Sequence, residues 1–472
     1  MKKALLFFLL LSYFSNSQTA GSLDLLFGIN GSTITDFNNS NDVANSIAIQ
    51  TDGKIVSVGD SYATPSNSRF AIVRYNTDGS LDNSFGVNGK VITSIGTYSA
   101  LAYSVKIQND GKILVGGCSM NSNGSNWNLT LARYNTDGTL DSSFGTGGIS
   151  INQSLSNGTI AWSIFIQQDG KIISSGMFFD GTFQNFAVFR YNSDGSLDTS
   201  FGTSGQSIIH VGSGHDFAVC MTQQNDGKIL LGGYTSINSD LDIALVRFNS
   251  NGLLDSSFGN NGIVLTAISS STDVATSIAI QSDGKIVLAG YTVEGVNTNI
   301  AVLRYNLLGT LDTTFGINGI VITQIGNNTD GANDIIIEPT GRLLIAGTTR
   351  NSSNQNNILL ANFNPDGSLN TSFGTNGIVT SQIGSTHCDA NTVKLLLDGK
   401  IIIGGRVYNG IDNDFLIARY NNFDDLGINE LSINKKLIKI IDLIGRETEY
   451  KPNTPLIYIY NDGTIEKIFK IE

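Results

Sequence analysis

The chain has 472 residues and a formal net charge of −12, with 53 glycines but only 5 prolines. This acidic balance, without any Lys/Arg cluster, argues against binding to nucleic acid or to an anionic membrane surface. Abundant glycine with little proline indicates many tight turns between short strands rather than a low-complexity chain.

The N-terminus predicts export. Two lysines precede an apolar run from Ala4 to Phe14, and small residues follow it. The run is too short to span a bilayer and is typical of a secretory signal peptide. We therefore predict a signal peptide at residues 1–17, with a membrane anchor as the alternative. No other stretch of the sequence is long and apolar enough to cross a membrane, so we expect a secreted or cell-surface protein.

Three motif series recur along residues 18–422. An FG-x-x-G fragment begins at Phe27, Phe85, Phe144, Phe201, Phe258, Phe315 and Phe373, at intervals of 57 to 59 residues. A DGK-type turn and an ARYN-like motif each recur seven times at the same spacing. A fixed period of this length is the signature of a repeat architecture. We number the repeats as residues 27–84, 85–143, 144–200, 201–257, 258–314, 315–372 and 373–422.

Each repeat predicts four short strands. In the second repeat these are residues 90–96, 103–108, 112–117 and 129–135, with an Asn-Asp-Gly hairpin between the second and third. Seven such units predict an all-β, seven-bladed propeller of four-stranded blades, with an open solenoid as the alternative. We expect the first strand of each repeat to be innermost. Because strands are also predicted near residues 32–37 and 415–421, we expect blade 7 to close on blade 1 without a borrowed strand.

The sequence resembles a known family at these motifs. RYNTDGSLDNSFGVNG, together with IQNDGKILVGG, is similar to the delta-60 repeat family of β-propellers, and the similarity spans about residues 21–422. Membership would imply the propeller fold and brings neither an established activity nor known catalytic residues.

The last segment, residues 423–472, departs from the repeat. It carries short apolar runs separated by turn residues, which predicts a small β domain. KLIKIIDLIGRE and PLIYIYNDGTIEK resemble the C-terminal sorting domain of type IX secretion substrates in Bacteroidetes. The resemblance implies contact with outer-membrane export machinery, and a plain structural appendage is the alternative.

The repeated polar residues have structural explanations. The Asn-x-Asp-Gly linkers, such as Asn76 to Gly79, resemble part of a calcium loop, but Leu308 takes the acidic position in one repeat. We therefore favour aspartates that cap their own turns, with calcium as the weaker alternative. Arg74 of the ARYN motif is predicted to pair with Asp82 in the linker. The odd count of three cysteines predicts free, buried thiols.

The candidate ligand-binding residues lie where the repeats differ. Loops at one end of the propeller vary freely, and rigid scaffolds commonly place binding on such loops; their aromatic residues include Tyr62, Trp127 and Phe183. A second group combines four equivalent aspartates with two adjacent histidines, which we expect to ring one mouth of the propeller: Asp42, Asp216, Asp273, Asp330, His215 and His387.

Catalysis has little support in the sequence. Three histidines are present, and neither a nucleophile elbow nor a metal-binding HExxH motif occurs. The leading hypothesis is a binding scaffold that presents its loops to a glycan, peptide or protein, with no cofactor. A polysaccharide hydrolase or lyase using Asp216 or Asp273 is the first alternative, and a structural surface component is the second.

Overall fold

The computed structural model describes residues 19–37, 39–64, 67–152, 158–237, 240–326, 329–422, 437–442, 446–448, 454–460 and 465–468. The predicted signal peptide lies outside these residues. The chain divides into two compact units, Met1–Phe423 and Asp424–Glu472. Strands and turns make up the described residues, which contain no helix.

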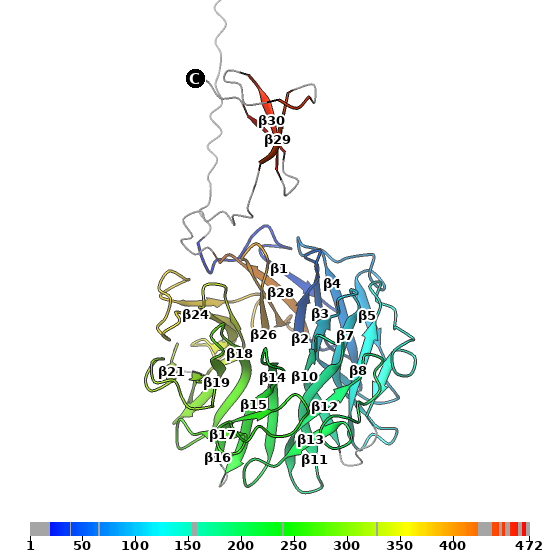
Figure 1. Cartoon of the computed structure of the whole chain (residues 1–472), viewed down its shortest axis with the longest axis vertical. Coiled ribbons are helices and arrows are strands. Elements are labelled where there is room, and N and C mark those ends of the chain that lie inside the picture. The colour runs from blue at the N-terminus through cyan, green and yellow to red at the C-terminus, as the bar shows by residue number, and fades with distance from the viewer. Residues whose placement is uncertain are drawn as a thin grey trace, which may run out of the picture. The chain divides into compact units, whose positions relative to one another are not determined.

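The first unit is a ring of seven four-stranded antiparallel sheets. Figure 1 shows β2, β10, β14 and β26 near its centre and β5, β16 and β21 toward its rim. Blade 1 contains β2 (Asp42–Ile49), β3 (Ile55–Thr64), β4 (Asn67–Tyr75) and β5 (Lys90–Thr93); blade 2 contains β6 (Ala100–Ile107), β7 (Ile113–Met120), β8 (Trp127–Tyr134) and β9 (Ile149–Ile151). Blade 3 contains β10 (Thr159–Ile166), β11 (Ile172–Phe179), β12 (Gln184–Tyr191) and β13 (Gln206–Ile209); blade 4 contains β14 (Asp216–Gln223), β15 (Ile229–Ile237), β16 (Asp240–Phe248) and β17 (Ile263–Thr266). Blade 5 contains β18 (Asp273–Ile280), β19 (Ile286–Glu294), β20 (Asn297–Tyr305) and β21 (Ile320–Thr323); blade 6 contains β22 (Asp330–Ile337), β23 (Leu343–Arg350), β24 (Asn356–Phe363) and β25 (Ile378–Ser381). The seven-bladed, all-β prediction is confirmed.

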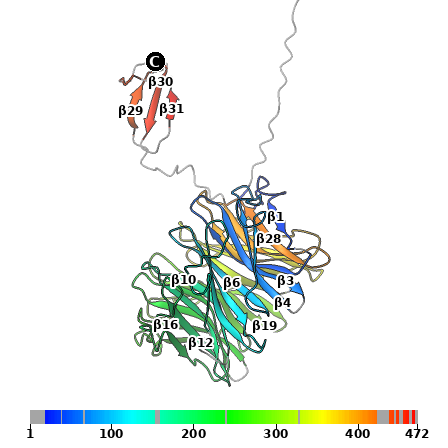
Figure 2. The same cartoon turned by 90° about the vertical axis from the view of Figure 1, so that its right-hand side faces the viewer.

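Blade 7 borrows its outermost strand from the N-terminus. It contains β26 (Cys388–Leu395), β27 (Ile401–Tyr408) and β28 (Asn413–Tyr420), and the fourth strand is β1 (Ser32–Thr35). β1 pairs antiparallel with β28 from Ser32–Ala418 to Thr35–Phe415, and the two strands lie side by side in Figures 1 and 2. The expected closure without a borrowed strand was therefore wrong.

The order of strands within each blade also differs from the prediction. The strand that follows FG-x-x-G is the outermost strand of the preceding blade, as β5 beside β4 shows, and the next strand begins a new blade. A repeat boundary read from the motif therefore falls inside a blade. The physical reason is that a cyclic repeat fixes the period but leaves the starting point of the unit open.

The core lies between the blades. Its seven clusters of buried apolar residues each combine side chains from two neighbouring blades, including one that joins blade 7 to blade 1 through Phe27, Phe37 and Phe415. No blade has to bury both faces by itself, because each neighbour covers one of them.

A β-bulge shapes every innermost strand. In β2 the register shifts between Ala44 and Ser46, and the carbonyl of Val43 then faces Gly59 on β3. A Cβ on Gly59 would lie 1.7 Å from that oxygen, so the position requires glycine. The bulge turns the residue after the alanine toward the next blade: Asn45 donates to the carbonyl of Ala102 at 2.9 Å.

The second unit contains a three-stranded antiparallel sheet. Its strands are β29 (Leu437–Ile441), β30 (Leu456–Tyr460) and β31 (Ile465–Ile468), with β30 in the middle. Figure 2 labels all three strands. Short strands were predicted for this segment. The turn between β30 and β31, residues 461–464, lies outside the described residues, and so does most of the connection between β29 and β30. Across the described chain, no helix is long and apolar enough to cross a membrane.

Candidate functional site

The repeated motifs form an ion network at one end of the propeller, which we call the motif end. Arg74 Nε lies 2.7 Å from Asp82 Oδ2, and Lys54 of the DGK turn lies 3.0 Å from the same oxygen. The Arg74 guanidinium stacks on Phe85, 4.5 Å from the ring centroid, and it donates to the carbonyl of Thr136 in the next blade. The predicted arginine–aspartate partnership is confirmed, and it joins neighbouring blades.

The same network recurs around the ring. The Arg–Asp pairs are Arg133–Asp141, Arg190–Asp198, Arg247–Asp255, Arg304–Asp312 and Arg419–Asp24. Blade 6 replaces both charges together: Asn370 donates to Asn362 at 3.0 Å, and Asn362 donates to Glu338 at 3.0 Å. Because six blades share the Arg–Asp pair and use it to join neighbouring blades, we assign this network a structural role.

The linker aspartates cap their own turns. Asp78 Oδ1 accepts hydrogen bonds from the backbone N–H of Ser80 at 2.9 Å and from its hydroxyl at 2.6 Å. Asp137, Asp194 and Asp366 do the same in their linkers. The turn-capping interpretation is thus confirmed at these positions.

The four equivalent aspartates are buried at the opposite end, which we call the variable end. Asp42, Asp216, Asp273 and Asp330 each begin an innermost strand and are 0 % exposed. Each accepts the backbone N–H of the crossover from the preceding blade, as in Phe37 to Asp42 at 2.7 Å and Val211 to Asp216 at 2.7 Å. Burial raises the pKa of Asp42 to about 7. The four aspartates predicted at one mouth of the propeller are therefore buried, and each joins its own blade to the preceding one.

The two adjacent histidines play a related part. His215 Nδ1 accepts the N–H of Gln184 at 3.2 Å, and His387 Nδ1 accepts the N–H of Asn356 at 3.0 Å. Ser99 accepts the N–H of Ser68 in the same way between blades 1 and 2. Both histidines are exposed, and they lie on different blades, 4 and 7. Within the described residues, no hydrogen bond or ion pair joins either histidine to one of the four aspartates.

A continuous group of rings does occupy the variable end of blades 3 and 4. We call it the aromatic patch, and it consists of Trp162, Phe183, His210, His215, Phe217 and Tyr234. Phe183 stacks on His210 with centroids 5.3 Å apart and meets His215 edge-on at 5.6 Å. Phe217 lies 6.4 Å from His215 and stacks on Tyr234 at 4.8 Å. Trp162 lies 6.0 Å from Phe217 and completes the group.

Polar contacts position two rings of the patch, Phe183 and His210. Asp180 Oδ1 accepts the N–H of Phe183 at 2.8 Å and thereby fixes the loop that carries this ring. His210 Nδ1 lies 3.0 Å from Asn185 Oδ1 and 3.0 Å from Asp216 Oδ2. The His210 side chain is still 42 % exposed. Positioned rings that remain accessible are suited to binding the flat apolar face of a ligand.

Phe183 and His215 were predicted from the sequence, whereas Trp162, His210, Phe217 and Tyr234 were not. Trp162 occupies the bulge position of its innermost strand, where Asn45 and Thr276 stand in other blades, and Phe217 directly follows Asp216. Other blades also carry rings at equivalent positions, with Tyr103 in the place of Trp162 and Tyr291 in the place of Tyr234, so the repeat alignment does not single out these residues. Trp127 and Tyr62, the other predicted aromatics, are half-buried on blades 2 and 1.

Tyr62 lies near a buried acid that was not predicted. Asp60 on β3 accepts hydrogen bonds from Asn45 and from the N–H of Ala102, both at 3.2 Å, and is 7 % exposed. Burial raises the pKa of Asp60 to about 7, and burial together with Asp60 raises the pKa of Tyr62. Other blades carry uncharged residues at this position, such as Cys118, apart from Arg406 in blade 7.

Asp60→Asn is expected to stabilise the protein above neutral pH. The folded-state pKa exceeds the unfolded value of 3.8, so the energetic cost of ionisation is absent below about pH 4 and grows until about pH 7. Asparagine keeps an acceptor for both donors and removes the charge. We expect a gain of about 2–4 kcal/mol at pH 8 and little change at pH 4, measured by urea unfolding at both pH values. An equal effect at both pH values would contradict this origin.

Charged residues also meet near the axis. Asp334 on β22 accepts hydrogen bonds from Ser277 of blade 5 at 2.9 Å and from the N–H of Val393 of blade 7 at 2.9 Å. Lys394 Nζ lies 3.2 Å from the same carboxylate. Burial and the charge of Lys394 lower the pKa of Lys106 to about 8. This group ties the innermost strands of blades 5, 6 and 7 together.

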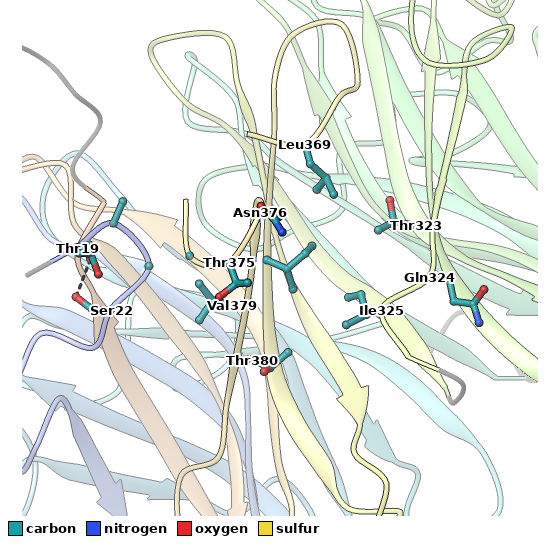
Figure 3. Close-up of a pocket in the computed structure, with 14 residues that line it drawn as sticks. Thr19, Ser22, Thr323, Gln324, Ile325, Leu369, Thr375, Asn376, Val379 and Thr380 are labelled. Carbon is teal, nitrogen blue, oxygen red and sulfur yellow. Dashed lines mark hydrogen bonds between the residues drawn. The ribbon is translucent and has the colours of Figure 1, made fainter. Parts of the chain in front are cut away.

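A groove of about 600 Å³ lies at the rim, between the outer strands of blades 5 and 6 and the N-terminal segment. Figure 3 shows Thr19 and Ser22 on the left, Thr323 and Gln324 on the right, and Thr375, Asn376 and Thr380 between them. Grooves with equivalent linings occur at other blade junctions, around Gly86 and around Gly202. We interpret this periodic groove as a consequence of blade packing rather than as a binding site.

The three cysteines are free and buried, as predicted: Cys118, Cys220 and Cys388. Burial raises the pKa of each thiol, which keeps it protonated and unreactive at neutral pH.

Seven four-stranded blades, locked by one repeated ion network and closed by a borrowed strand, define a repeat β-propeller. The repeats match the DUF5122 beta-propeller, a domain of unknown function, at residues 50–85, 108–144, 167–201, 224–258, 281–315, 338–373 and 396–424. These matches cover more than half of the chain, and the protein belongs to this family, which is of the delta-60 type.

Solved structures share the fold at low identity. The polysaccharide lyase Uly1 has a TM-score of 0.46 and 12% identity, over 80% of this chain and 90% of that one. Sqt1 from Chaetomium thermophilum, solved bound to the N-terminus of ribosomal protein L10, has a TM-score of 0.40 and 12% identity, over 82% of this chain and 98% of that one. At these identities the similarity concerns the fold alone. No curated protein matches the chain.

Proposed function

We propose that the protein is an exported binding module that holds a carbohydrate at the aromatic patch. Export is inferred from the predicted signal peptide at residues 1–17 and from the resemblance of the C-terminal segment to a sorting domain. The observation that carries the binding function is the continuous, accessible run of rings across blades 3 and 4.

The patch has the two features that a sugar ring needs. Aromatic faces accept the apolar C–H face of a sugar, while polar groups beside them bond its hydroxyls. Phe183 and Phe217 supply faces, and the exposed His210, His215 and Asp180 supply polar groups at the edge. Because the carboxylates beside the patch are Asp180 and Asp216 and the protein is acidic overall, neutral or amino sugars fit better than anionic ones.

A glycan array probed with the mature chain, residues 18–472, tests this proposal. We expect selective binding of neutral or amino sugars, confirmed by calorimetry. Phe183→Ala should weaken binding at least tenfold, or by about 1.4 kcal/mol, because rings at the centre of an interface dominate affinity. Phe183→Trp should preserve it.

Trp127→Ala is the matched control. Trp127 is a half-buried aromatic at the same end of the propeller, at the start of β8 on blade 2, and its loss should leave the affinity unchanged. Failure to bind any glycan on the array, or an equal loss of affinity in Phe183→Ala and Trp127→Ala, would count against the patch as the binding site. A peptide or protein ligand would then be the occupant to seek.

The alternative, a polysaccharide-cleaving enzyme, was predicted to use Asp216 or Asp273, and both are inaccessible. Asp216 and Asp273 are fully buried and hold crossovers, so neither is placed to reach a substrate. An enzyme would have to use the accessible His215 and Tyr234 of the patch instead. Incubating any bound glycan with the protein and measuring its chain length distinguishes cleavage from binding.

A further inference from the structure

Three carboxylates meet where the ring closes. Asp36 directly follows β1, Asp42 begins β2, and Asp414 is the second residue of β28. One carboxylate oxygen of each lies within 4.8 Å of those of the other two. Calcium–oxygen bonds of 2.3–2.6 Å place opposite ligands about 4.8 Å apart, so this spacing fits a shared ion.

One of these carboxylates has an unsatisfied buried oxygen. Asp414 is 4 % exposed, and its Oδ2 accepts the side-chain amide of Asn409 at 2.9 Å. Its Oδ1 is buried and has no hydrogen-bond partner among the described residues. A buried carboxylate oxygen without a donor or cation is costly, which points to a missing ligand.

The local charge is also uncompensated. Asp42 accepts the N–H of Phe37 at 2.7 Å and the Ser40 hydroxyl at 3.1 Å, and Asp36 accepts the N–H of Asn39 at 2.7 Å. These donors are neutral. Lys90 contributes one positive charge nearby, although its ammonium group bonds the backbone carbonyl of Asp36 at 2.6 Å. One cation therefore faces three carboxylates.

The equivalent junctions between other blades carry fewer acidic residues. Between blades 3 and 4 the corresponding residues are His210, Asn185 and Asp216, so an imidazole and an amide accompany a single acid. Between blades 5 and 6 they are Gln324, Asn299 and Asp330. Between blades 4 and 5 they are Ala267, Asp242 and Asp273, with two acids. Three acids occur only at the junction between blades 7 and 1 among these junctions, where the pairing of β1 with β28 closes the ring without a peptide bond.

We propose that Asp36, Asp42 and Asp414 bind a calcium ion that clamps the borrowed strand β1 between blades 7 and 1. The donors are all oxygens, which calcium prefers, and the Ser40 hydroxyl and water can complete its shell of 6–8 ligands. The ion would join the stretch that runs from β1 into β2, which carries Asp36 and Asp42, to β28 of the last blade, which carries Asp414. This inference is independent of the carbohydrate-binding proposal.

The test uses the mature chain, residues 18–472, freed of metal with EDTA. Calcium should bind with a stoichiometry of one by calorimetry and raise Tm by about 2–4 °C at about 10 mM, well above the 10⁻⁴–10⁻³ M affinity range of extracellular calcium modules. Asp36→Asn and Asp414→Asn should abolish both the binding and the shift. Both variants should melt at or above the metal-free wild type, because each removes one of three mutually repelling charges.

Asp242→Asn is the matched control, since Asp242 occupies the position of Asp414 in blade 4 and should leave the calcium response unchanged. Sodium chloride at equal ionic strength controls for screening. The proposal is overturned if calcium produces neither heat nor a Tm shift, or if the shift persists in Asp36→Asn and Asp414→Asn. Equal stabilisation by magnesium would overturn the assignment to calcium.

Discussion

A chain that begins at residue 38 is expected to lose its folded propeller. Removing residues 18–37 takes β1 from the edge of blade 7, removes Phe27 and Phe37 from the core between blades 7 and 1, and deprives Arg419 and Lys400 of Asp24. Loss of each buried phenylalanine costs about 3–5 kcal/mol, and breaking a buried ion pair a similar amount. The sum approaches or exceeds the usual 5–15 kcal/mol stability of a domain.

Circular dichroism and thermal unfolding of the shortened chain measure this loss. A synthetic peptide of residues 18–37 should restore the β signal and the transition when added in excess, whereas a scrambled peptide should not. A shortened chain that melts at the wild-type temperature would show that closure by β1 contributes little.

A circular permutant provides the sharper control. Asn421 accepts the N–H of Gly21 at 2.7 Å and donates its own N–H to Ser22 at 2.8 Å. Asn76, Gly79 and Ser80 make the same two bonds within the continuous linker of blade 1. Joining Asn421 directly to Thr19 should therefore recreate an ordinary linker. We expect a chain of residues 38–421 followed by 19–37 to fold, with Tm within a few degrees of that of residues 18–422.

This closure shows what the sequence could and could not predict. The period, the number of blades and the Asp-Gly hairpins followed from motifs that repeat, and so did the Arg74–Asp82 pair. The residues TAGSLD at 19–24 also match TDGSLD at 77–82, so the signal for a split seventh unit was present. It was missed because self-similarity does not say which strand of a cyclic unit is innermost.

The candidate site was harder to predict because its residues lie outside the repeated motifs. Trp162 and Tyr234 lie on β10 and β15, His210 directly follows β13, and none of them belongs to the three repeated motif series. The aspartates at the variable end do recur, which suggested a ring, but recurrence in this chain marks the residues that join blades. The patch depends instead on contacts between two blades, because single rings such as Tyr103 and Tyr291 stand at equivalent positions elsewhere.

Breaking one ion network at the motif end should produce the second large effect. Arg247 and Asp255 are almost fully buried, 2.8 Å apart, and Arg247 also lies 4.2 Å from the centroid of Phe258. Burial opposes ionisation of Asp255, but the Ser257 hydroxyl and N–H, Lys228 and Arg247 together hold the pKa of this carboxyl below its usual range. Arg247→Asn leaves the buried acid with one lysine and should cost about 3–5 kcal/mol in urea unfolding at pH 7.

The effect of Arg247→Asn on the free energy of unfolding should depend on pH, because Asp255 is ionised in the folded protein. Asp255 has a lowered folded-state pKa, so its stabilising contribution is present above the unfolded value of 3.8 and is lost as the pH falls through the folded one. The difference between wild type and Arg247→Asn should therefore shrink on acidification from pH 7 to about pH 3. A difference that stays constant over that range would assign the effect to lost packing on Phe258 instead.

Blade 6 supplies the control, because it lacks this pair and still folds. There Glu338, Asn362 and Asn370 occupy the positions of Gln224, Arg247 and Asp255 and hydrogen-bond to one another. The triple variant Gln224→Glu, Arg247→Asn, Asp255→Asn transplants that set into blade 4. It should recover most of the loss and remain within about 1–2 kcal/mol of wild type, since residues of one network are strongly non-additive. If it is as unstable as Arg247→Asn alone, the arginine stabilises the ring through its contacts with Phe258 and the Leu307 carbonyl of the next blade rather than through its charge partner.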